Sequence, residues 1–303
     1  MSDFKILIAP SARESFGKYE EAYGNHVEMI EKRTFPDGEF VIKVDSNLDS
    51  NIVFIVQNGY PDQHMHFFEV LQIAEVAKTK GAKDIVLVSP YLSFSRQDRR
   101  TLEGEPFTLK LVCDLYRMNG ISTIIAVDVH NTDAFRNIDI NIINIDPIDI
   151  WSQYFSLKDL ETVVLLSPDN GGSKRISNYA RRLGIPSVSL DKNKDITGKT
   201  WYTEANEDVI NHLREKDVLI IDDLCSSGST FIPLANFLLN YHPKSITYAI
   251  THFFGDEEHI KNQIHSPVNI LFSDTIPSRK HTISVFELIS QQINHYKKDV
   301  ARC

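Results

Sequence analysis

The sequence predicts an α/β fold built from two similar halves, each with a mostly parallel sheet. Short runs rich in valine and isoleucine alternate with stretches of helical periodicity along the 303 residues, and this alternation is typical of βαβ units. The expected strands are Lys5–Ile8, Ile52–Val56, Ile85–Ser89, Ile124–Val127, Val163–Ser167, Val218–Ile221 and Ile246–Ile250. The clearest helical patterns between them are Phe67–Lys80, Leu109–Met118, Ser173–Leu183 and Phe231–Leu239.

Glycines and one polar break organise these elements. Gly81, Gly120 and Gly184 follow three of the expected helices, where a left-handed C-terminal cap is common. The Asp146-Pro147 pair interrupts the pattern, so we expect an N-terminal domain of residues 1–146 and a C-terminal domain of residues 147–282. The amphipathic stretch at residues 283–298 predicts a helix that packs on one of the domains, with the N-terminal domain as our choice.

Composition narrows the classes of function. The chain is 42% hydrophobic and 24% charged, which is ordinary for globular domains. Its net charge is -9 with no long basic run, so we expect no nucleic-acid partner. No apolar run approaches the ~18 residues of a membrane span, and the start lacks the apolar region of a signal peptide, so no membrane partner is expected. The three cysteines are widely spaced, which argues against a disulfide framework or a zinc site and favours a reducing, cytoplasmic location.

The strongest functional motif is VLIIDDLCSSGST, from Val218 to Thr230. A buried strand is expected to end in two adjacent carboxylates, Asp222 and Asp223, and a loop of small residues then leads into a helix. Vicinal carboxylates can accept hydrogen bonds from the cis hydroxyls of a ribose. The hydroxyl groups and unhindered N–H groups of the loop, at a helix N-terminus, suit a phosphate.

This segment resembles the phosphoribosyl-binding loop of type I phosphoribosyltransferases and of ribose-phosphate diphosphokinases, which commonly reads D-D-x-x-[DS]-T-G-G-T. The resemblance implies two phosphoribosyltransferase-like (Rossmann-like) domains with mostly parallel sheets. In this chain Ser227 stands in place of the threonine and Ser229 in place of the second glycine. The residues that it implies for binding ribose 5-phosphate are Asp222, Asp223, Ser226, Ser227, Gly228, Ser229 and Thr230.

A second motif, SPYLSFSRQDRR, resembles the P-Y-x-x-x-x-R-Q-D-[RK] segment of the diphosphokinases. Arg96 and Gln97 follow an expected strand, from which they can reach triphosphate oxygens, and arginine does so with a forked geometry. By resemblance Asp98 belongs to the same ATP-binding set. The next stretch, RRTLEGEPFTLK, resembles the G-E-P-[IF]-[ST]-x-K continuation of archaeal-type members of the family.

A third motif, FPDGEF, begins at Phe35, and its Pro-Asp-Gly core predicts a turn. In the family, the matching F-x-D-G-E segment crosses a subunit interface and meets the adenine of a neighbour's ATP. The resemblance therefore implies that Phe35 lies against the base and that Asp37 and Glu39 bind its edge. It also implies a homo-oligomer, a dimer or a hexamer, with its active site at the subunit interface.

Two further segments concern the metal and the catalytic groups. His130 follows one expected strand and Asp169 follows another, and the resemblance implies Mg²⁺ ligands at both, with His130 also in the ATP site. Because Mg²⁺ prefers oxygen ligands, we expect the imidazole to act through water. In the Lys-rich segment LDKNKDITGK, Lys192 and Lys194 match the catalytic K-x-R of a family loop that closes over the reaction. Lys194 keeps the charge of the usual arginine but not its bidentate fork.

Together these motifs imply diphosphoryl transfer from Mg-ATP to the anomeric hydroxyl of ribose 5-phosphate, giving phosphoribosyl pyrophosphate and AMP, with Mg²⁺ as cofactor. Three alternatives remain open. The altered phosphate loop is compatible with a larger ribose-5-phosphoryl acceptor such as ADP-ribose. A phosphoribosyltransferase would use the Asp222–Thr230 loop alone, although the ATP-type motifs argue against it. The lysine at position 194 is compatible with a non-catalytic regulatory homologue.

Overall fold

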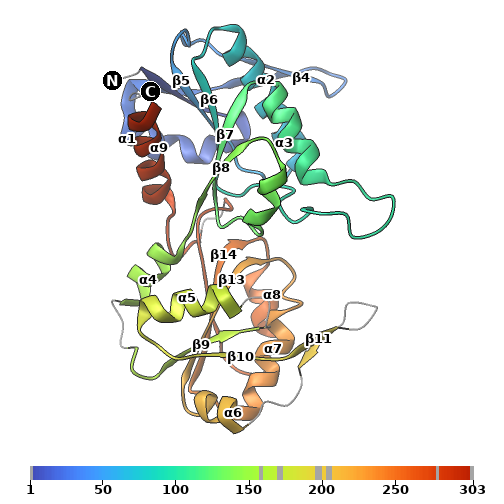
Figure 1. The fold of residues 1–303 in the computed structure, drawn as a ribbon, viewed down its shortest axis with the longest axis vertical. Helices are drawn as coiled ribbons and strands as arrows, with labels where there is room; N and C mark the ends of the chain where they lie inside the picture. The colour runs from blue at the N-terminus through green and yellow to red at the C-terminus, as the bar shows by residue number, and fades with distance from the viewer. Residues whose placement is uncertain are drawn as a thin grey trace. The chain divides into compact units, whose positions relative to one another are not determined.

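The computed structural model describes residues 3–156, 160–168, 173–194, 200–202, 207–277 and 280–300. The chain forms two compact units, and each of them is an α/β layer structure with its own parallel sheet (Figure 1). The α/β fold expected from the sequence is therefore confirmed. The first unit comprises Met1–Asp146, Thr275–Pro277 and Val285–Cys303, and the second comprises Pro147–Asp274 and Ser278–Ser284.

The first unit contains a six-stranded parallel sheet in the order β2-β1-β5-β6-β7-β8. Every residue of β5 is buried, as expected for a parallel sheet covered by helices on both faces. Helices α1 and α9 lie on one face, and α2 and α3 lie on the other (Figure 1). The strands are β1 (Phe4–Ile8), β2 (Val27–Met29), β5 (Ile52–Val56), β6 (Asp84–Ser89), β7 (Ile121–Val127) and β8 (Asn141–Ile145). The helices are α1 (Phe16–Tyr23), α2 (Gln63–Thr79), α3 (Thr108–Met118) and α9 (Phe286–Val300), with 3-10 turns η1 (Pro10–Ser15), η2 (Gly24–His26) and η3 (Thr132–Asn137).

Helix α9 belongs to the first unit, although it follows the second unit in the chain. The Tyr296 hydroxyl group donates a hydrogen bond to Asp84 Oδ2 at 2.7 Å and lies 3.1 Å from the Thr123 hydroxyl oxygen. Lys297 Nζ lies 3.7 Å from the centroid of the Phe4 ring. The end of the described chain therefore completes the fold of the first unit.

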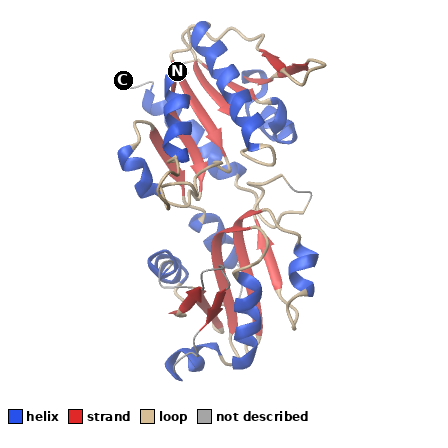
Figure 2. Ribbon diagram, turned by 90° about the vertical axis from the view of Figure 1, so that its right-hand side faces the viewer, coloured by secondary structure: helices blue, strands red, loops and turns tan. Residues whose placement is uncertain are grey.

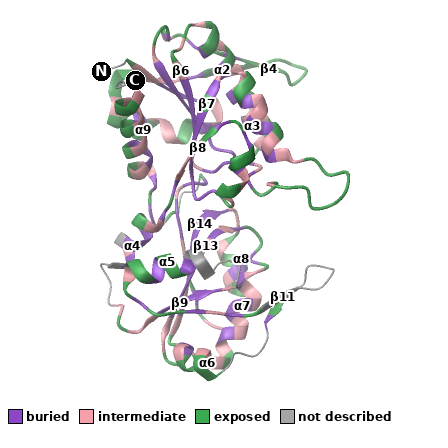
Figure 3. Ribbon diagram, viewed as in Figure 1, coloured by how far each residue is buried: buried purple, intermediate pink, exposed green. Residues whose placement is uncertain are grey.

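The second unit has a five-stranded parallel sheet in the order β10-β9-β13-β14-β15. One face is covered by α4 and α5, whose Trp151 and Tyr179 join one apolar cluster, and the other by α7 and α8. Figure 2 shows helices flanking the strands of the sheet. Figure 3 shows the central strands of both sheets buried. The strands are β9 (Val163–Ser167), β10 (Ser187–Ser189), β13 (Asp217–Cys225), β14 (Ser245–Phe253) and β15 (Asn269–Phe272). The helices are α4 (Ile148–Ser156), α5 (Ser173–Leu183), α6 (Glu207–Leu213), α7 (Phe231–Leu238) and α8 (Glu257–Asn262), with a 3-10 turn η5 (Leu239–Tyr241).

Each unit also carries a two-stranded antiparallel hairpin outside its main sheet. In the first unit β3 (Glu31–Thr34) pairs with β4 (Phe40–Lys43). In the second unit β11 (Lys192–Lys194) pairs with β12 (Thr200–Tyr202). Both hairpins coincide with segments that the sequence marks as functional.

All seven expected strands are present, and the three glycines that were expected to cap helices have positive φ values of 78°, 93° and 70°. Several strand boundaries were wrong: β7 begins at Ile121 rather than Ile124, and β14 continues to Phe253 rather than ending at Ile250. The strand predicted to end at Ile221 continues to Cys225, because β14 is equally long and supplies partners as far as Phe253. Asp222 and Asp223 therefore lie within β13 rather than after it. Among the described residues, no helix is long and apolar enough to cross a membrane.

Candidate active site

In the first unit, two loops with predicted ATP-site residues meet at one edge of the sheet. Arg96, Gln97 and Asp98 follow β6, and His130 follows the neighbouring strand β7. The carboxyl ends of parallel neighbours share an edge, which is where ligands bind in open α/β sheets. A hydrogen bond of 2.5 Å from Asn131 Nδ2 to Asp98 Oδ2 joins the two loops directly.

Asn131 fixes this junction and was missed in the sequence. Its Oδ1 accepts a hydrogen bond from the Asp133 backbone N–H at 3.1 Å, so that the side chain caps η3 while its amide group donates to Asp98. The Asp98 side chain is only 9% exposed. The signal available in the sequence was an asparagine, a good capping residue, directly after the predicted site residue His130.

Both loops contain a non-glycine residue with left-handed backbone just before a predicted ligand residue. Phe94 has φ of 65° two positions before Arg96, and Asp128 has φ of 49° two positions before His130. Such conformations cost about 1–3 kcal/mol each and cluster at functional sites. Arg96 and His130 are themselves exposed.

The FPDGEF segment forms the turn of the β3–β4 hairpin. The Phe35 N–H donates to the Glu39 carbonyl oxygen at 2.7 Å, and the Glu39 N–H donates to Asp37 Oδ1 at 3.1 Å. Gly38 has φ of 92°, which the turn requires and most other residues resist. The Phe35 ring is 38% exposed, with the Arg33 guanidinium 4.9 Å from its centroid. The turn thus displays an aromatic ring and two carboxylates toward solvent.

In the second unit, the acidic pair sits near the carboxyl end of β13. Asp222 Oδ2 accepts a hydrogen bond from the Tyr248 hydroxyl group at 2.9 Å, and its Oδ1 accepts one from the Asp223 N–H at 3.0 Å. The Asp223 residue is 8% exposed. Serines 226, 227 and 229 are exposed on the loop that follows, and Gly228 takes φ of 75°.

Tyr248 is a second residue that the sequence did not reveal. It pairs in register with Ile220, two positions before Asp222, and its ring stacks on Phe231 at a centroid distance of 4.0 Å. Burial, followed by the charge of Asp222, raises the pKa of Tyr248 well above its ordinary 10.0. The phenol therefore keeps its proton at neutral pH and holds the Asp222 carboxylate in one orientation.

Gly255, a third missed residue, lies against the loop that follows β13. A Cβ atom at Gly255 would lie 2.4 Å from the Ser226 carbonyl oxygen, a distance that no side chain tolerates. The Phe254 N–H donates to the Cys225 carbonyl oxygen at 2.8 Å and holds the same two segments together. The shape of the loop after β13 thus depends on the backbone that follows β14.

The predicted catalytic segment coincides with the β11–β12 hairpin. Lys192 pairs with Tyr202 and Lys194 with Thr200. The side chains of both lysines lie outside the described residues, as do residues 195–199 and the predicted metal ligand Asp169. The catalytic and metal-binding roles of these residues stay predictions.

Comparison with known proteins identifies the chain. A family model described as the N-terminal domain of ribose phosphate pyrophosphokinase matches residues 4–120, and a phosphoribosyl transferase domain model matches residues 139–291. A ribose-phosphate pyrophosphokinase of Saccharolobus solfataricus is 32% identical over 225 residues, which cover 74% of this chain and 76% of the relative. The chain belongs to the ribose-phosphate pyrophosphokinase family. The family expected from the motifs is confirmed.

Other relatives extend the match over nearly the whole chain. A ribose-phosphate pyrophosphokinase of Oceanobacillus iheyensis is 29% identical over 300 residues, covering 96% of this chain and 93% of the relative. The crystal structure of phosphoribosylpyrophosphate synthetase from Mycobacterium smegmatis superposes with a TM-score of 0.86 at 19% identity, covering 98% of this chain and 99% of the other. The fold of this pyrophosphokinase family therefore spans both units.

Each of the two family models covers some of the predicted site residues. The pyrophosphokinase N-terminal model covers the FPDGEF turn and the loop with Arg96, and the phosphoribosyl transferase model covers the β11–β12 hairpin and the loop from Asp222 to Thr230. His130 falls between the two matched ranges. Its place in the site therefore rests on its position after β7 and on the bond between Asn131 and Asp98.

Proposed function

We propose that this chain transfers the diphosphoryl group of Mg-ATP to the anomeric hydroxyl of ribose 5-phosphate, forming phosphoribosyl pyrophosphate and AMP. The observation that carries the proposal is the Asp222 carboxylate, which Tyr248 orients at the head of a loop with three exposed serines. Such a group is suited to a ribose, and the same chain carries a second set of loops suited to a triphosphate. Membership of the pyrophosphokinase family supports both assignments.

The acceptor half of the proposal uses the loop after β13. Asp222 and Asp223 accept hydrogen bonds from the ribose hydroxyl groups. The loop of Ser226–Thr230 binds the 5-phosphate at the start of α7, where N–H groups and the helix dipole favour an anion. The exposed serine hydroxyl groups add donors there.

The ATP half uses the first unit. Arg96 and Gln97 bind triphosphate oxygens, and Asp98 fixes their loop to that of His130. The Phe35–Glu39 turn binds the adenine of ATP held by a neighbouring subunit, because an exposed ring beside carboxylates suits a purine and its amino edge. A homo-oligomer, a dimer or a hexamer, follows from this assignment. A cytoplasmic location stays a prediction.

In the reaction, the anomeric oxygen attacks the β-phosphorus of ATP in line and loses its proton. The bond between the β-phosphorus and the oxygen that bridges it to the α-phosphorus breaks, and AMP leaves with that oxygen. The protein contributes positioning and charge stabilisation, as in other phosphoryl transfers. Lys192 and Lys194 supply positive charge to the transferring group when their loop closes and excludes water.

The residues of the chain suit Mg²⁺ as the cofactor. His130 is exposed in a loop that Asn131 and Asp98 fix, so its imidazole can reach an ion through a bound water. Asp169 would supply a carboxylate oxygen, the ligand type that Mg²⁺ prefers. When bound, the ion neutralises charge on the phosphoryl oxygens.

A product assay tests the proposal. The protein is incubated with Mg-ATP and ribose 5-phosphate, ADP-ribose or unphosphorylated ribose, and AMP and ADP are separated by chromatography. We expect AMP in equal amount to phosphoribosyl pyrophosphate with ribose 5-phosphate alone. ADP without AMP contradicts diphosphoryl transfer.

The same assay decides between the remaining candidates. A larger acceptor is the second candidate, because Ser226, Ser227 and Ser229 leave the phosphate loop exposed. AMP release with ADP-ribose but not with ribose 5-phosphate identifies that acceptor. No AMP with any acceptor identifies a non-catalytic homologue.

A further inference from the structure

A fully buried carboxylate in the first unit has no part in the reaction proposed above. Glu69, in α2, has an exposed fraction of 0%. Its Oε1 accepts hydrogen bonds from Ser11 Oγ at 2.9 Å and Lys32 Nζ at 2.9 Å. Its Oε2 accepts from the Ser11 N–H at 3.2 Å and Gln57 Nε2 at 2.6 Å. Such complete pairing is what allows a charge to be buried, since an unpaired one is strongly destabilising.

The partners of Glu69 come from three separate segments. Ser11 lies in η1, which follows β1, and Gln57 directly follows β5, so both belong to loops at the carboxyl edge of the sheet. Lys32 lies in β3 of the hairpin, and its Nζ is 5.3 Å from the centroid of the Phe40 ring in β4. Glu69 thus ties the hairpin to the edge of the sheet where the ATP loops lie.

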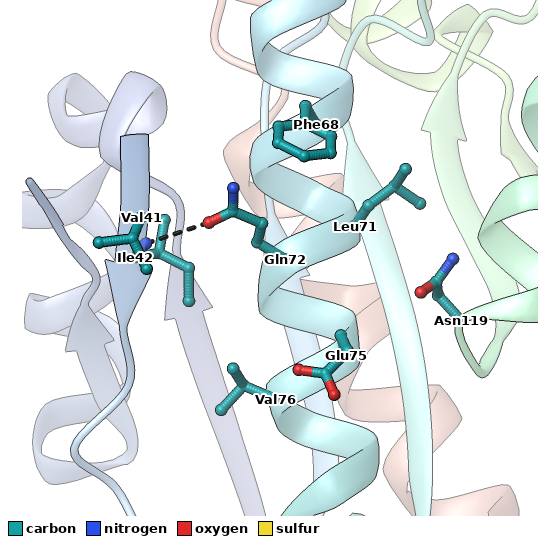
Figure 4. Close-up of a pocket in the computed structure, with 8 residues that line it drawn as sticks. All are labelled: Val41, Ile42, Phe68, Leu71, Gln72, Glu75, Val76 and Asn119. Atoms are coloured by element: carbon teal, nitrogen blue, oxygen red, sulfur yellow. Dashed lines mark hydrogen bonds between the residues drawn. The ribbon is translucent and has the colours of Figure 1, made fainter. Parts of the chain in front are cut away.

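Gln72 makes a second attachment from the same helix, three residues on and therefore on the same face as Glu69. Its Oε1 accepts a hydrogen bond from the Ile42 N–H at 3.1 Å, which Figure 4 shows, and its Nε2 donates to the Phe40 carbonyl oxygen at 3.1 Å. Phe68 adds an edge-to-face contact with the Phe40 ring at 5.7 Å. The amide group of Gln72 therefore bonds one N–H and one carbonyl group of the β4 backbone, as a neighbouring strand would.

An isolated two-stranded hairpin is marginally stable, and β3 pairs only with β4 among the described strands. The attachments through Glu69 and Gln72 therefore help to hold the hairpin and its turn against α2. We propose that Glu69 and Gln72 are positioning residues, which hold the Phe35–Glu39 turn in place for the purine of ATP. This inference rests on the adenine contact in the proposed function.

The test compares Glu69→Gln and Gln72→Leu in the full-length chain with Glu75→Gln as a matched control. Glu75 is exposed on the same helix and accepts a hydrogen bond from Thr79. Hydrogen exchange is measured at the amides of the turn, and equilibrium binding is measured for ATP and for inorganic tripolyphosphate, which lacks the base. Both positioning variants should exchange at least about tenfold faster at the turn and bind ATP about tenfold more weakly, the effect of about 1.4 kcal/mol. Their affinity for tripolyphosphate and the behaviour of Glu75→Gln should not change.

Unchanged exchange at the turn in Glu69→Gln and Gln72→Leu overturns the inference, and so does faster exchange with unchanged affinity for ATP. Should Glu69→Gln fail to fold, Gln72→Leu decides, because it removes only two hydrogen bonds to the backbone of β4. None of these measurements needs an acceptor. If the wild type forms no AMP but the variants behave as expected, the proposed transfer fails while the positioning role stands.

Discussion

The two units hold their candidate ligand residues by different means. In the first unit, side chains bridge loops that are distant in the sequence: Asn131 reaches Asp98, and Glu69 gathers donors from three segments. In the second unit, one loop is shaped by close backbone packing, with Gly255 pressed against Ser226. The Tyr248 hydroxyl group supports Asp222, at the head of this loop, through a side-chain hydrogen bond.

The difference follows from the length of the connections. The loop after β6 runs for 18 residues from Pro90 to Phe107 before α3 begins, so it needs side-chain attachments to adopt one conformation. The loop after β13 spans only Ser226–Thr230 between a strand and a helix, and its backbone is fixed at both ends. Removing a polar side chain should therefore disturb the candidate ligand residues of the first unit. Adding volume at a tightly packed position should disturb those of the second unit.

The largest effect is expected at the β11–β12 hairpin. The predicted role of this hairpin depends on the charge of its lysines and not on side-chain bridges or backbone packing. Lys192→Ala should lower kcat by about 10²–10³-fold and raise KM for ATP far less, because a cation on a closing loop acts mainly in the transition state. Lys194→Ala should act in the same direction, and Lys194→Arg should retain or raise activity. Steady-state kinetics at saturating Mg²⁺ measures these effects. A near-normal kcat in Lys192→Ala would mean that the catalytic segment lies elsewhere.

The second prediction tests support by backbone packing. Gly255→Ala places a methyl group 2.4 Å from a carbonyl oxygen that cannot rotate away. Overpacking costs about 1–3 kcal/mol, so KM for ribose 5-phosphate should rise by up to about 10²-fold. Gly17→Ala is the control, since nothing lies within 4 Å of its added Cβ. Equal kinetics in the two variants would show that the phosphate loop does not depend on Gly255.

The local elements of the fold could be read from the sequence, because apolar runs and capping glycines determine them. The strands at Ile52–Val56 and Val163–Ser167 were predicted at both ends. Short edge strands such as β10 were missed, since a strand of three residues is too short to show a recognisable apolar run. The length of β13 was missed for another reason: it depends on its partner β14, which continues to Phe253.

The residues that position the site could not be found in the same way. Motifs mark groups that face a ligand, such as Asp222, and say nothing about what holds them. Tyr248 reaches Asp222 from a strand 26 residues away, and Lys32 meets Glu69 across 37 residues. Such pairs are specified by sheet order and helix packing, which appear only in three dimensions.

The third prediction tests support by polar bridges. Asn131→Ala removes the hydrogen bond to Asp98 and the bond from the Asp133 N–H that caps η3. Loss of a hydrogen bond to a charged group costs about 2 kcal/mol of stability. KM for ATP should rise about 30-fold. Asn236→Ala is a matched control, because Asn236 makes a similar two-sided bridge, to Gln263 and His265. Equal rises in KM in both variants would reflect general loosening rather than loss of the loop junction.

The smallest effect is expected at the hydrogen bond from Tyr248 to Asp222 in the second unit. Tyr248→Phe keeps the stack on Phe231 and removes the hydroxyl group that donates to Asp222, so KM for ribose 5-phosphate should rise about tenfold while kcat changes less. Tyr296→Phe is the control. It removes a similar bond to Asp84, the first residue of β6 in the first unit, and should leave KM for ribose 5-phosphate unchanged.

A pH series separates the loss of this bond from a loss of packing. Because the pKa of Tyr248 is raised in the folded protein, its contribution to stability is complete below the ordinary value of 10.0 and is lost as pH rises above it. The wild type should therefore lose stability above pH 10 more steeply than Tyr248→Phe, as thermal unfolding between pH 7 and about pH 11 can measure. Parallel stability curves, with unchanged KM, would mean that the Tyr248 hydroxyl group does not orient Asp222.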